Sequence, residues 1–216
     1  MCGINGFNWQ DENLIKKMNT KIAHRGPDDA GAFVAPKISL GHQRLSIIDL
    51  SPRAHQPMTS RDGRYVIVYN GELYNFKELK KDLENKYQFN SDSDTEIILY
   101  SYAEWGLECL QKFNGIFAFA IWDNQKEELF LARDRAGVKP LYYYFADGKF
   151  IFSSEIKAIL EHNIPRKIDE VARELYFRVL YVPGPLTMFK NIKKLEPAHY
   201  LKYANNEIKI TRYWQV

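Results

Sequence analysis

The 216-residue sequence has little cysteine and no long apolar run. Its two cysteines, Cys2 and Cys109, do not lie in a metal-binding C-x-x-C spacing, and low cysteine usage suits a reducing compartment. The start MCGINGFNWQDEN has polar side chains where a signal peptide is apolar, and no run approaches the length of a membrane span. We therefore expect a cytoplasmic protein with a native N-terminus, in which removal of Met1 is the only processing step.

The sequence also lacks a strong charge of either sign. Its formal net charge is +3 and its lysines are spread along the chain, so no concentrated basic face argues for nucleic acid. No G-x-x-x-x-G-K phosphate loop and no cluster with metal-ligand spacing are found. We expect no cofactor, no metal, no nucleic-acid partner and no membrane partner for these residues. A hydrophobic content of 45%, with 14 Tyr and 13 Phe, indicates a globular protein with a real core.

The second residue carries the most informative chemical signal. Removal of Met1 would leave Cys2 with a thiol and a free α-amine, which is a nucleophile tethered to its own general base. An α-amine titrates near about 7.7–8.0, so roughly a tenth of it is unprotonated at neutral pH. The alternative is an idle N-terminal cysteine, and residue 2 alone does not separate the two. Cys109 lies in a helical pattern and is interpreted as a buried small hydrophobe.

Short strands, several of them joined by short turns, alternate with amphipathic helices, which predicts an α+β layered fold. Arg64–Tyr69 is predicted to be a strong strand that stops at a sharp turn at Asn70-Gly71-Glu72. The runs 66–69 and 116–121 are nearly continuously apolar, which predicts strands buried on both faces. Further strand patterns cover 2–7, 32–48, 117–122, 128–133, 141–145 and 150–154, and a hairpin is predicted at 198–213. A loop is predicted at 50–63, and helical patterns cover 11–24, 75–86, 95–105, 154–161 and 169–181.

Seven segments, in order and spacing, resemble the glutaminase domain of class II glutamine amidotransferases. They are MCGI at the start, HRGPD at 24–28, HQRLSIID at 42–49, NGELYN at 70–75, SDSDTE at 91–96, FAFAIWD at 117–123 and ARDRAGVKPLYY at 132–143. FSSEIKAIL at 152–160 and the stretch 181–201 are most similar to the asparagine synthetase branch. The resemblance implies an N-terminal-nucleophile hydrolase fold: a four-layer α/β/β/α sandwich of two antiparallel sheets covered by helices.

The resemblance also implies the parts of a glutamine site. Cys2 would be the nucleophile, and the Asn70 side chain and Gly71 backbone N–H would form the oxyanion hole. Arg44 would pair with the α-carboxylate of glutamine, and Asp94, helped by Glu72, with its α-ammonium. Leu45, Ser46, Ile47 and Ile48 would line the pocket. The competing interpretations are a plain turn at Asn70-Gly71, a surface arginine and a helix N-cap at Ser93 or Asp94. His24, His42 and His55 are interpreted as structural.

The implied function is hydrolysis of L-glutamine to L-glutamate and ammonia through a γ-glutamyl thioester. The ammonia would serve ATP-dependent asparagine synthesis from aspartate, with ATP and Mg held only by a synthetase domain that is absent from this chain. We take residues 1–216 as one glutamine amidotransferase domain, isolated or truncated, with 163–216 as an extension toward that partner domain. A homodimer is a candidate assembly. The alternatives are a sugar or peptide-like ammonia acceptor, or a non-catalytic interaction module if Met1 is retained.

Overall fold

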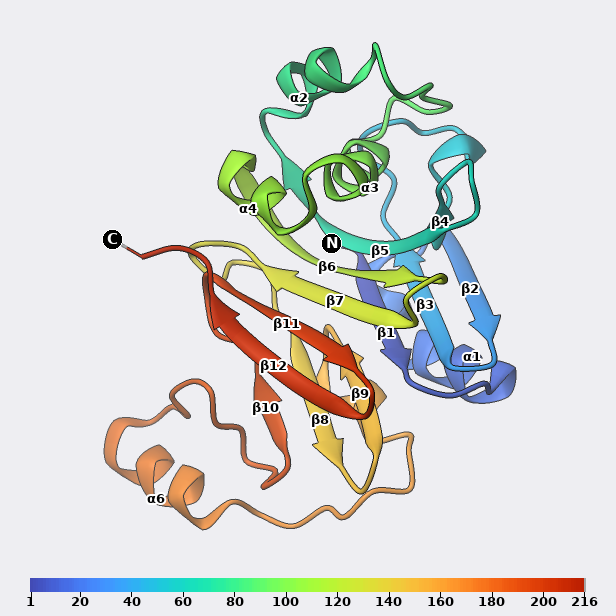
Figure 1. Cartoon of the computed structure of the whole chain (residues 1–216). Helices are drawn as coiled ribbons and strands as arrows, with labels where there is room; N and C mark the ends of the chain where they lie inside the picture. Colours follow the sequence, from blue (N-terminus) through green and yellow to red (C-terminus); the bar gives the residue numbers. More distant parts are fainter. Residues whose placement is uncertain (216) are drawn as a thin grey trace.

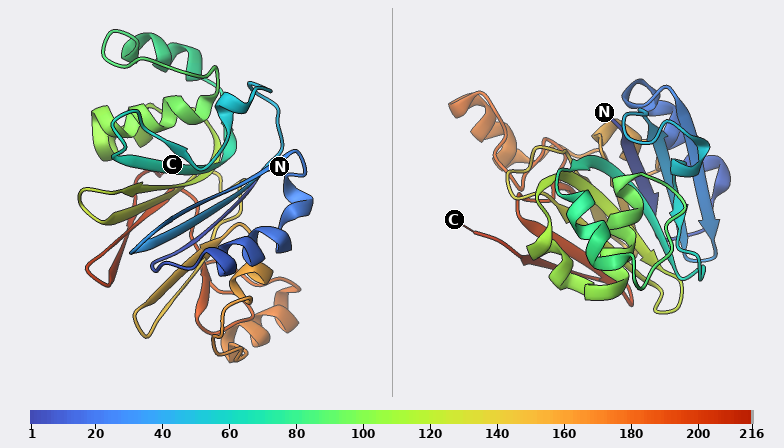
Figure 2. Two further views of the ribbon diagram at one scale, coloured as in Figure 1. Left: turned by 90° about the vertical axis from the view of Figure 1, so that its right-hand side faces the viewer. Right: turned by 90° about the horizontal axis from the view of Figure 1, so that it is seen from above.

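Two antiparallel six-stranded sheets lie face to face between two layers of helices in the computed structural model, which describes residues 1–215 (Figures 1 and 2). This is the predicted α+β arrangement. One sheet has the order β10 (Ile192–Lys194), β8 (Tyr142–Ala146), β9 (Lys149–Ser153), β1 (Gly3–Phe7), β3 (Ile38–Arg44), β2 (Asp29–Ala35). The other has the order β12 (Glu207–Arg212), β11 (His199–Ala204), β7 (Glu128–Arg133), β6 (Gly115–Asp123), β5 (Tyr65–Leu73), β4 (Met58–Thr59).

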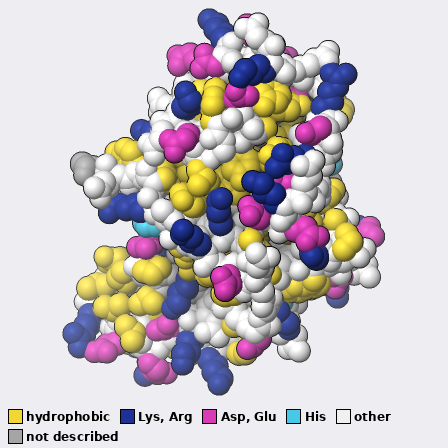
Figure 3. Space-filling model, in the orientation of Figure 1, with side chains coloured by type: hydrophobic (Ala, Val, Ile, Leu, Met, Phe, Trp, Pro, Cys, Tyr) yellow, Lys and Arg dark blue, Asp and Glu magenta, His cyan; other side chains and the backbone are white. Residues whose placement is uncertain are grey.

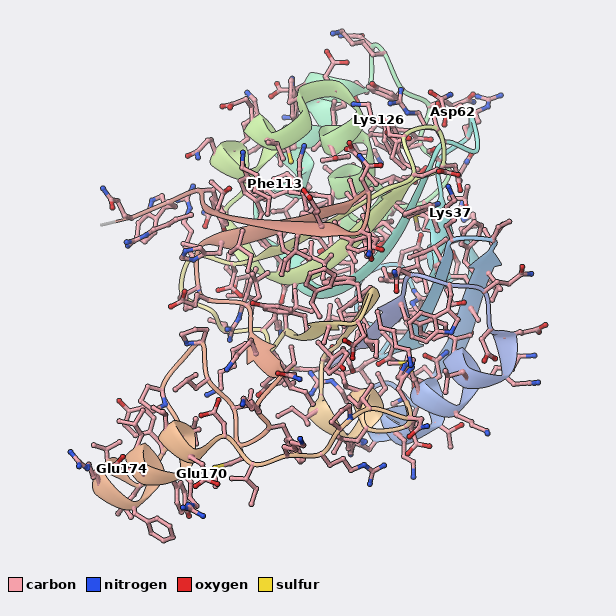
Figure 4. The ribbon with its side chains drawn as sticks, turned by 60° about the horizontal axis from the view of Figure 1, so that its bottom comes forward. Lys37, Asp62, Phe113, Lys126, Glu170 and Glu174 are labelled. Atoms are coloured by element: carbon pink, nitrogen blue, oxygen red, sulfur yellow. The ribbon has the colours of Figure 1, made fainter. Side chains whose placement is uncertain are left out.

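The helices form two separate layers over the sheets. Helices α1 (Glu12–Lys21) and α5 (Ile156–Ile159) pack on the β1 sheet, with a short 3-10 turn at Ala23–Arg25 after α1. Helices α2 (Phe76–Leu83), α3 (Asp94–Trp105) and α4 (Cys109–Lys112) cover the β5 sheet, with 3-10 turns at Pro52–Ala54 and Gly106–Glu108 nearby in the chain. Helix α6 (Glu170–Val179) projects from the body, and its Glu170 and Glu174 point outward (Figure 4).

Strand alternation divides the apolar side chains among the layers. In β5, Ile67 and Tyr69 belong to the core under α3, whereas Val66 and Val68 belong to the core between the sheets. Both faces of β5 are therefore covered, as the continuous apolar run predicted. Phe113 fills the same helix-side core, and Cys109 is fully buried there (Figure 4).

The prediction that strand β5 stops at Asn70 is wrong. The strand continues to Leu73, and Asn70 and Gly71 pair with Ala118 and Phe117 of β6. Gly71 is required here by close packing, because a Cβ on it would lie 2.4 Å from the carbonyl oxygen of Ile116. Long-range pairing with β6 thus overrides the local turn signal of the Asn-Gly pair.

Several other boundaries also differ from the sequence patterns. The pattern over 32–48 is a hairpin, β2 and β3, because the chain turns at Pro36 and the strand ends at Arg44. The loop predicted at 50–63 contains the short strand β4, and the helix predicted at 154–161 is the single turn α5. Asn75 precedes α2, yet its amide donates to the carbonyl of Lys112 and does not cap the helix.

Residues after 163 supply β10 to one sheet and β11 and β12 to the other. The exposed apolar side chains on and after α6 form a patch that Figure 3 shows at the lower left: Val171, Tyr176, Phe177, Val179, Leu180 and Tyr181. At the opposite, hairpin-turn end of the sandwich lie Lys37, Asp62 and Lys126 (Figure 4). Within residues 1–215, no helix has both the length and the hydropathy to cross a bilayer.

Candidate functional site

A cavity opens where β1 begins, where β3 ends, where β5 passes residues 69–72, and where α3 begins. Nine of the ten predicted site residues line it, and Ser46 does not; its backbone N–H donates to Asp28 Oδ2 at 2.7 Å. The cavity-lining residues are Met1, Cys2, Arg44, Leu45, Ile47, Ile48, Gln56, Tyr69, Asn70, Gly71, Glu72, Ser93, Asp94, Thr95 and Lys139. The fold therefore brings together residues that are as many as 138 positions apart.

The Cys2 thiol is held by the chain that follows β3. Its Sγ lies 3.4 Å from the backbone nitrogen of Leu45 and 3.6 Å from the Leu45 carbonyl oxygen. Burial raises the pKa of the Cys2 thiol, while the Leu45 N–H and the charge of Arg44 oppose that rise. The thiol is consequently not a preformed thiolate at neutral pH, and its use as a nucleophile requires a base.

The Cys2 backbone is held from the other side by Arg25. The Arg25 Nε donates to the carbonyl oxygen of Cys2 at 2.9 Å, and its Nη1 pairs with Glu155 Oε1 at 2.9 Å. Glu155 also receives His24 Nε2 at 2.8 Å and Lys157 at 3.1 Å. Although burial opposes ionisation, these three donors lower the pKa of Glu155 to about 2. The Glu155 carboxylate thus fixes Arg25, which in turn fixes the main chain of Cys2, a link that the sequence pattern did not reveal.

Asn70 presents an amide with no partner. Its Nδ2 makes no hydrogen bond to any atom of residues 1–215, and the residue is only 1% exposed, so bulk water does not replace the missing partner. Buried polar groups are nearly always paired, so an unpaired amide lining a cavity indicates a ligand that completes it. The position of Asn70 is fixed through Tyr69, whose N–H donates to Gln56 Oε1 at 2.7 Å and whose carbonyl accepts from His42 Nε2 at 3.0 Å.

The strand register directs the Gly71 N–H to the edge of β5 that faces away from β6. Bonds from Tyr74 N to the Asn114 carbonyl and from Asn124 N to the Arg64 carbonyl place the even-numbered residues of β5 in hydrogen-bonded pairs with β6. Odd-numbered residues therefore direct their N–H groups to the opposite edge. There Gln56 takes the N–H of Tyr69 and Asp94 Oδ2 takes that of Leu73 at 2.9 Å. Gly71 lies between them.

Asp94 begins α3 but does not cap it. Ser93 Oγ accepts the Thr95 N–H at 3.2 Å, which leaves the Asp94 carboxylate for the cavity. Its Oδ2 accepts from the Tyr69 hydroxyl at 2.8 Å and from the Leu73 N–H. Burial raises the pKa of Asp94, and these two donors limit the rise.

Arg44 supplies the opposite charge. Its guanidinium donates to the carbonyl oxygens of Ser51, at 3.2 Å, and Asp49, so the loop after β3 anchors it at the cavity wall. Those bonds use one N–H on each terminal nitrogen, and the fork retains donors for an anion. A cavity with an arginine and an aspartate suits a zwitterion that carries a carboxylate and an ammonium.

His24, His42 and His55, which we interpreted as structural, do not line the cavity. His42 is fully buried, and burial lowers its pKa to about 4, so it is neutral at pH 7 and ties β3 to β5 through the Tyr69 carbonyl. His24 Nε2 lies 2.8 Å from Glu155 Oε1, and His55 Nδ1 lies 2.6 Å from Asp29 Oδ2. Residues 1–215 hold no group of three or more His, Cys, Asp or Glu placed to bind a metal ion.

Sequence reasoning missed Gln56, Tyr69 and Lys139 as cavity residues. Gln56 connects β5 to α3, because its Nε2 also donates to Thr95 Oγ1 at 3.1 Å. Tyr69 belongs to the predicted strand 64–69, and Lys139 belongs to the motif ARDRAGVKPLYY at 132–143. Side-chain direction, which depends on register and on loop shape, is what the pattern did not supply.

Comparisons with known proteins agree with this arrangement. A family model described as "Glutamine amidotransferase domain" matches residues 1–214. The glutamine-hydrolysing asparagine synthetase 3 of Bacillus subtilis (strain 168) is 41% identical over 229 residues, covering 100% of this chain and 37% of its own length. A putative asparagine synthetase 2 of Methanocaldococcus jannaschii is 42% identical over 243 residues, covering 100% and 47%. The chain spans less than half the length of these relatives.

The solved glutamine phosphoribosylpyrophosphate amidotransferase of Bacillus subtilis, in complex with ADP and GMP, has a similar fold. It superposes with a TM-score of 0.72 at 21% identity, over 100% of this chain and 50% of that one. At this identity the likeness is evidence for the fold alone. The two helix-covered antiparallel sheets predicted from the sequence are therefore also those of a known enzyme architecture.

Proposed function

The chain belongs to the glutamine amidotransferase domain family, and from that premise we propose that it hydrolyses L-glutamine to L-glutamate and ammonia through Cys2. The observation that carries the proposal is the unpaired Asn70 Nδ2 in the cavity that also holds the Cys2 thiol, Arg44 and Asp94. A thiol, an unused oxyanion donor and two opposite charges are the parts that an amide hydrolase for a zwitterion needs.

The proposed reaction has two steps. Once Met1 is removed, the α-amine of Cys2 takes the thiol proton, and Sγ attacks the side-chain carbonyl carbon of glutamine. The oxyanion is held by Asn70 Nδ2 and the Gly71 N–H, and its collapse expels ammonia, to which the amine returns the proton. Water then attacks the γ-glutamyl thioester carbonyl with the amine again as base, so that glutamate leaves and the thiol is restored.

The charged side chains of the cavity hold the substrate. Arg44 pairs with the α-carboxylate and Asp94 with the α-ammonium, and Glu72, which also lines the cavity, adds a second acidic group. The backbone of Leu45, which already holds the thiol, and the side chains of Ile47 and Ile48 close the wall near the substrate. The amide is thereby directed toward Sγ at a fixed distance from both oxyanion donors.

The role of Cys2 is tested by its replacement. Cys2→Ala is expected to abolish glutamate release while the fold is kept, and Cys109→Ala, which removes the other thiol, is expected to retain activity. Intact mass first establishes that the preparation begins at Cys2. A Cys2→Ala chain that still hydrolyses glutamine would refute the proposal, as would labelling of Cys109 by a thiol-directed glutamine analogue.

We also propose that the ammonia is passed to ATP-dependent asparagine synthesis by a synthetase domain that holds ATP and Mg. The support is the name that the two similar relatives share. Amidase chry2 of Gibberella zeae, 36% identical over 225 residues, carries a different name, so the acceptor is to be tested. We expect [15N]amide-glutamine, aspartate and ATP to give labelled asparagine when the chain is combined with the synthetase half of a relative. Labelled ammonia without labelled asparagine would refute this step and leave glutamine hydrolysis standing.

A further inference from the structure

Lys139 is an unusual presence in the cavity wall. The residue is 8% exposed, and no carboxylate lies within 4 Å of its ammonium among residues 1–215. Its one hydrogen-bond partner in that range is the thioether sulfur of Met1, at 3.4 Å. Buried lysines are rare without an anionic partner, because removing an ammonium from water is costly. A weak acceptor such as a thioether does not offset that cost.

The loop that carries Lys139 is built to hold it in this place. The buried carboxylate of Asp134 accepts the N–H groups of Ala136 at 3.1 Å, Val138 at 2.9 Å and Lys139 itself at 3.0 Å. The side chain of Arg133, the residue before Asp134, donates its Nε–H to the carbonyl oxygen of Lys139 at 2.7 Å. Both sides of the Lys139 backbone are thus fixed by side chains, and the loop has little freedom to carry the ammonium out to solvent.

We propose that Lys139 holds the α-amine of Cys2 in its neutral, proton-accepting form and favours the Cys2 thiolate. Removal of Met1 takes away the thioether and exposes the Cys2 amine to the same space. Five covalent bonds separate the Met1 sulfur from the Cys2 nitrogen, so the ammonium lies within about 10 Å of that nitrogen. A neighbouring cation disfavours protonation of an amine, a device that activates other amine nucleophiles and bases.

Other charged and titratable groups surround the same amine, and none of them is altered when Lys139 is replaced. Those facing the cavity are Arg44 on β3, Tyr69 and Glu72 on β5 and Asp94 on α3; Arg25, Glu155 and His24 lie behind the Cys2 carbonyl, and Arg133 and Asp134 flank Lys139. Two of the cavity groups are acidic and oppose Lys139. Lys139, together with Arg44, offsets these two acidic groups and thereby helps to keep the amine available as a base near neutral pH.

The expected shift follows from Coulomb's law. At about 10 Å, one unit charge changes a neighbouring pKa by about 0.3 units in water and by about 1.2 units at an effective dielectric of about 20. Lys139→Met keeps the side-chain length and removes the charge. We expect the acidic limb of the kcat/KM profile for glutamine to move upward by about 0.3 to about 1.2 pH units.

The experiment uses the chain that begins at Cys2, verified by intact mass. The controls are Lys139→Arg, which keeps the charge, and Lys126→Met, which removes a lysine at the far end of β6 (Figure 4). Both are expected to keep the wild-type acidic limb. Lys139→Gln replaces Lys139→Met if the latter does not fold. A raised KM with an unmoved acidic limb would overturn the proposal and assign Lys139 to substrate binding.

A second readout separates this inference, which rests on the proposed function, from that function itself. Alkylation of Cys2 by iodoacetamide needs no turnover, and the buried Cys109 is its internal control. We expect the alkylation midpoint of Lys139→Met to move upward in pH with the kinetic limb. Matching wild-type and variant midpoints would overturn the role of Lys139. Absence of glutamine hydrolysis in the wild type would overturn the proposed function, and the alkylation profile would still decide the role of Lys139.

Discussion

Replacement of Asn70 by alanine isolates one oxyanion donor. The Nδ2 of Asn70 is buried and unpaired, so in the free protein it is available for a ligand without first breaking another bond. Removing one such donor from an acyl-transfer site costs about 2.7–4 kcal/mol of transition-state stabilisation, or about 10²–10³ in kcat. The Gly71 N–H remains on the strand edge, so we expect residual activity within that range and a KM that changes far less.

The same observation predicts what happens to stability. Because Asn70 Nδ2 makes no hydrogen bond in the folded chain, Asn70→Ala removes a desolvated polar group together with a small amount of packing. We expect its urea midpoint to stay at or slightly above that of the wild type.

The assay is glutamate release measured alongside urea unfolding. Asn70→Asp is the matched control, because it keeps the shape and places an acceptor where the oxyanion forms, so its kcat should fall further than that of alanine. A kcat for Asn70→Ala within tenfold of wild type would refute the oxyanion assignment. So would a rate loss that is matched by a comparable loss of folding stability.

Two more substitutions test the proposed ammonium partner, Asp94, and the carboxylate that pairs with Arg25, Glu155. Asp94→Asn removes one charge-assisted hydrogen bond to the α-ammonium of glutamine, so we expect the KM for glutamine to rise by about 10- to 100-fold and kcat to change less. An equal loss in kcat would contradict the proposed contact of Asp94 with the α-ammonium. Because burial raises the pKa of Asp94, wild-type binding should weaken with acid before an ordinary aspartate would protonate. Glu155→Gln is expected to be less stable than wild type at pH 7, with Glu161→Gln, whose partner is the exposed Lys21 at 3.3 Å, as the control. The pKa of Glu155 falls from 4.5 to about 2 on folding, so its contribution is full above pH 4.5 and is lost as pH falls toward 2; a stability difference that persists at pH 2 in urea unfolding would exclude the ion pair as its source.

The α+β class was predicted from strand and helix patterns, whereas the four-layer sandwich and nine of the ten cavity-lining candidates followed from the resemblance of seven short segments to a known family. Nearly continuous apolar runs identified β5 and β6, and Cys2 stood out for a chemical reason at the chain start. Asn70 and Gly71 line the cavity together with Cys2, but their predicted local structure is wrong, because the Asn-Gly pair is a turn signal and only pairing with β6 extends the strand. Local pattern does not encode such pairing.

Side-chain partners across the fold were beyond the pattern for a similar reason. The contact of Arg25 with the Cys2 carbonyl joins residues 23 positions apart, and its partner Glu155 lies 130 positions further along. Lys139 was part of a quoted segment, yet nothing in that segment shows which of its residues points into the cavity. Its direction is set by how Asp134 and Arg133 fold the loop, which is a tertiary property.

The edge of β5 explains how a regular strand could provide the oxyanion hole that we propose. The N–H groups of the alternate residues Tyr69, Gly71 and Leu73 point to the edge of β5 that faces away from β6. Gln56 accepts the N–H of Tyr69, and Asp94 accepts that of Leu73. These acceptors fix the strand on both sides of Gly71, whose own N–H lies between them and has no assigned acceptor among residues 1–215. Since a paired strand is stiffer than a turn, this donor is held in place before substrate arrives, which is the condition under which electrostatic stabilisation is most effective. The continuation of β5 through Asn70-Gly71 is thus what fixes the direction of both donors.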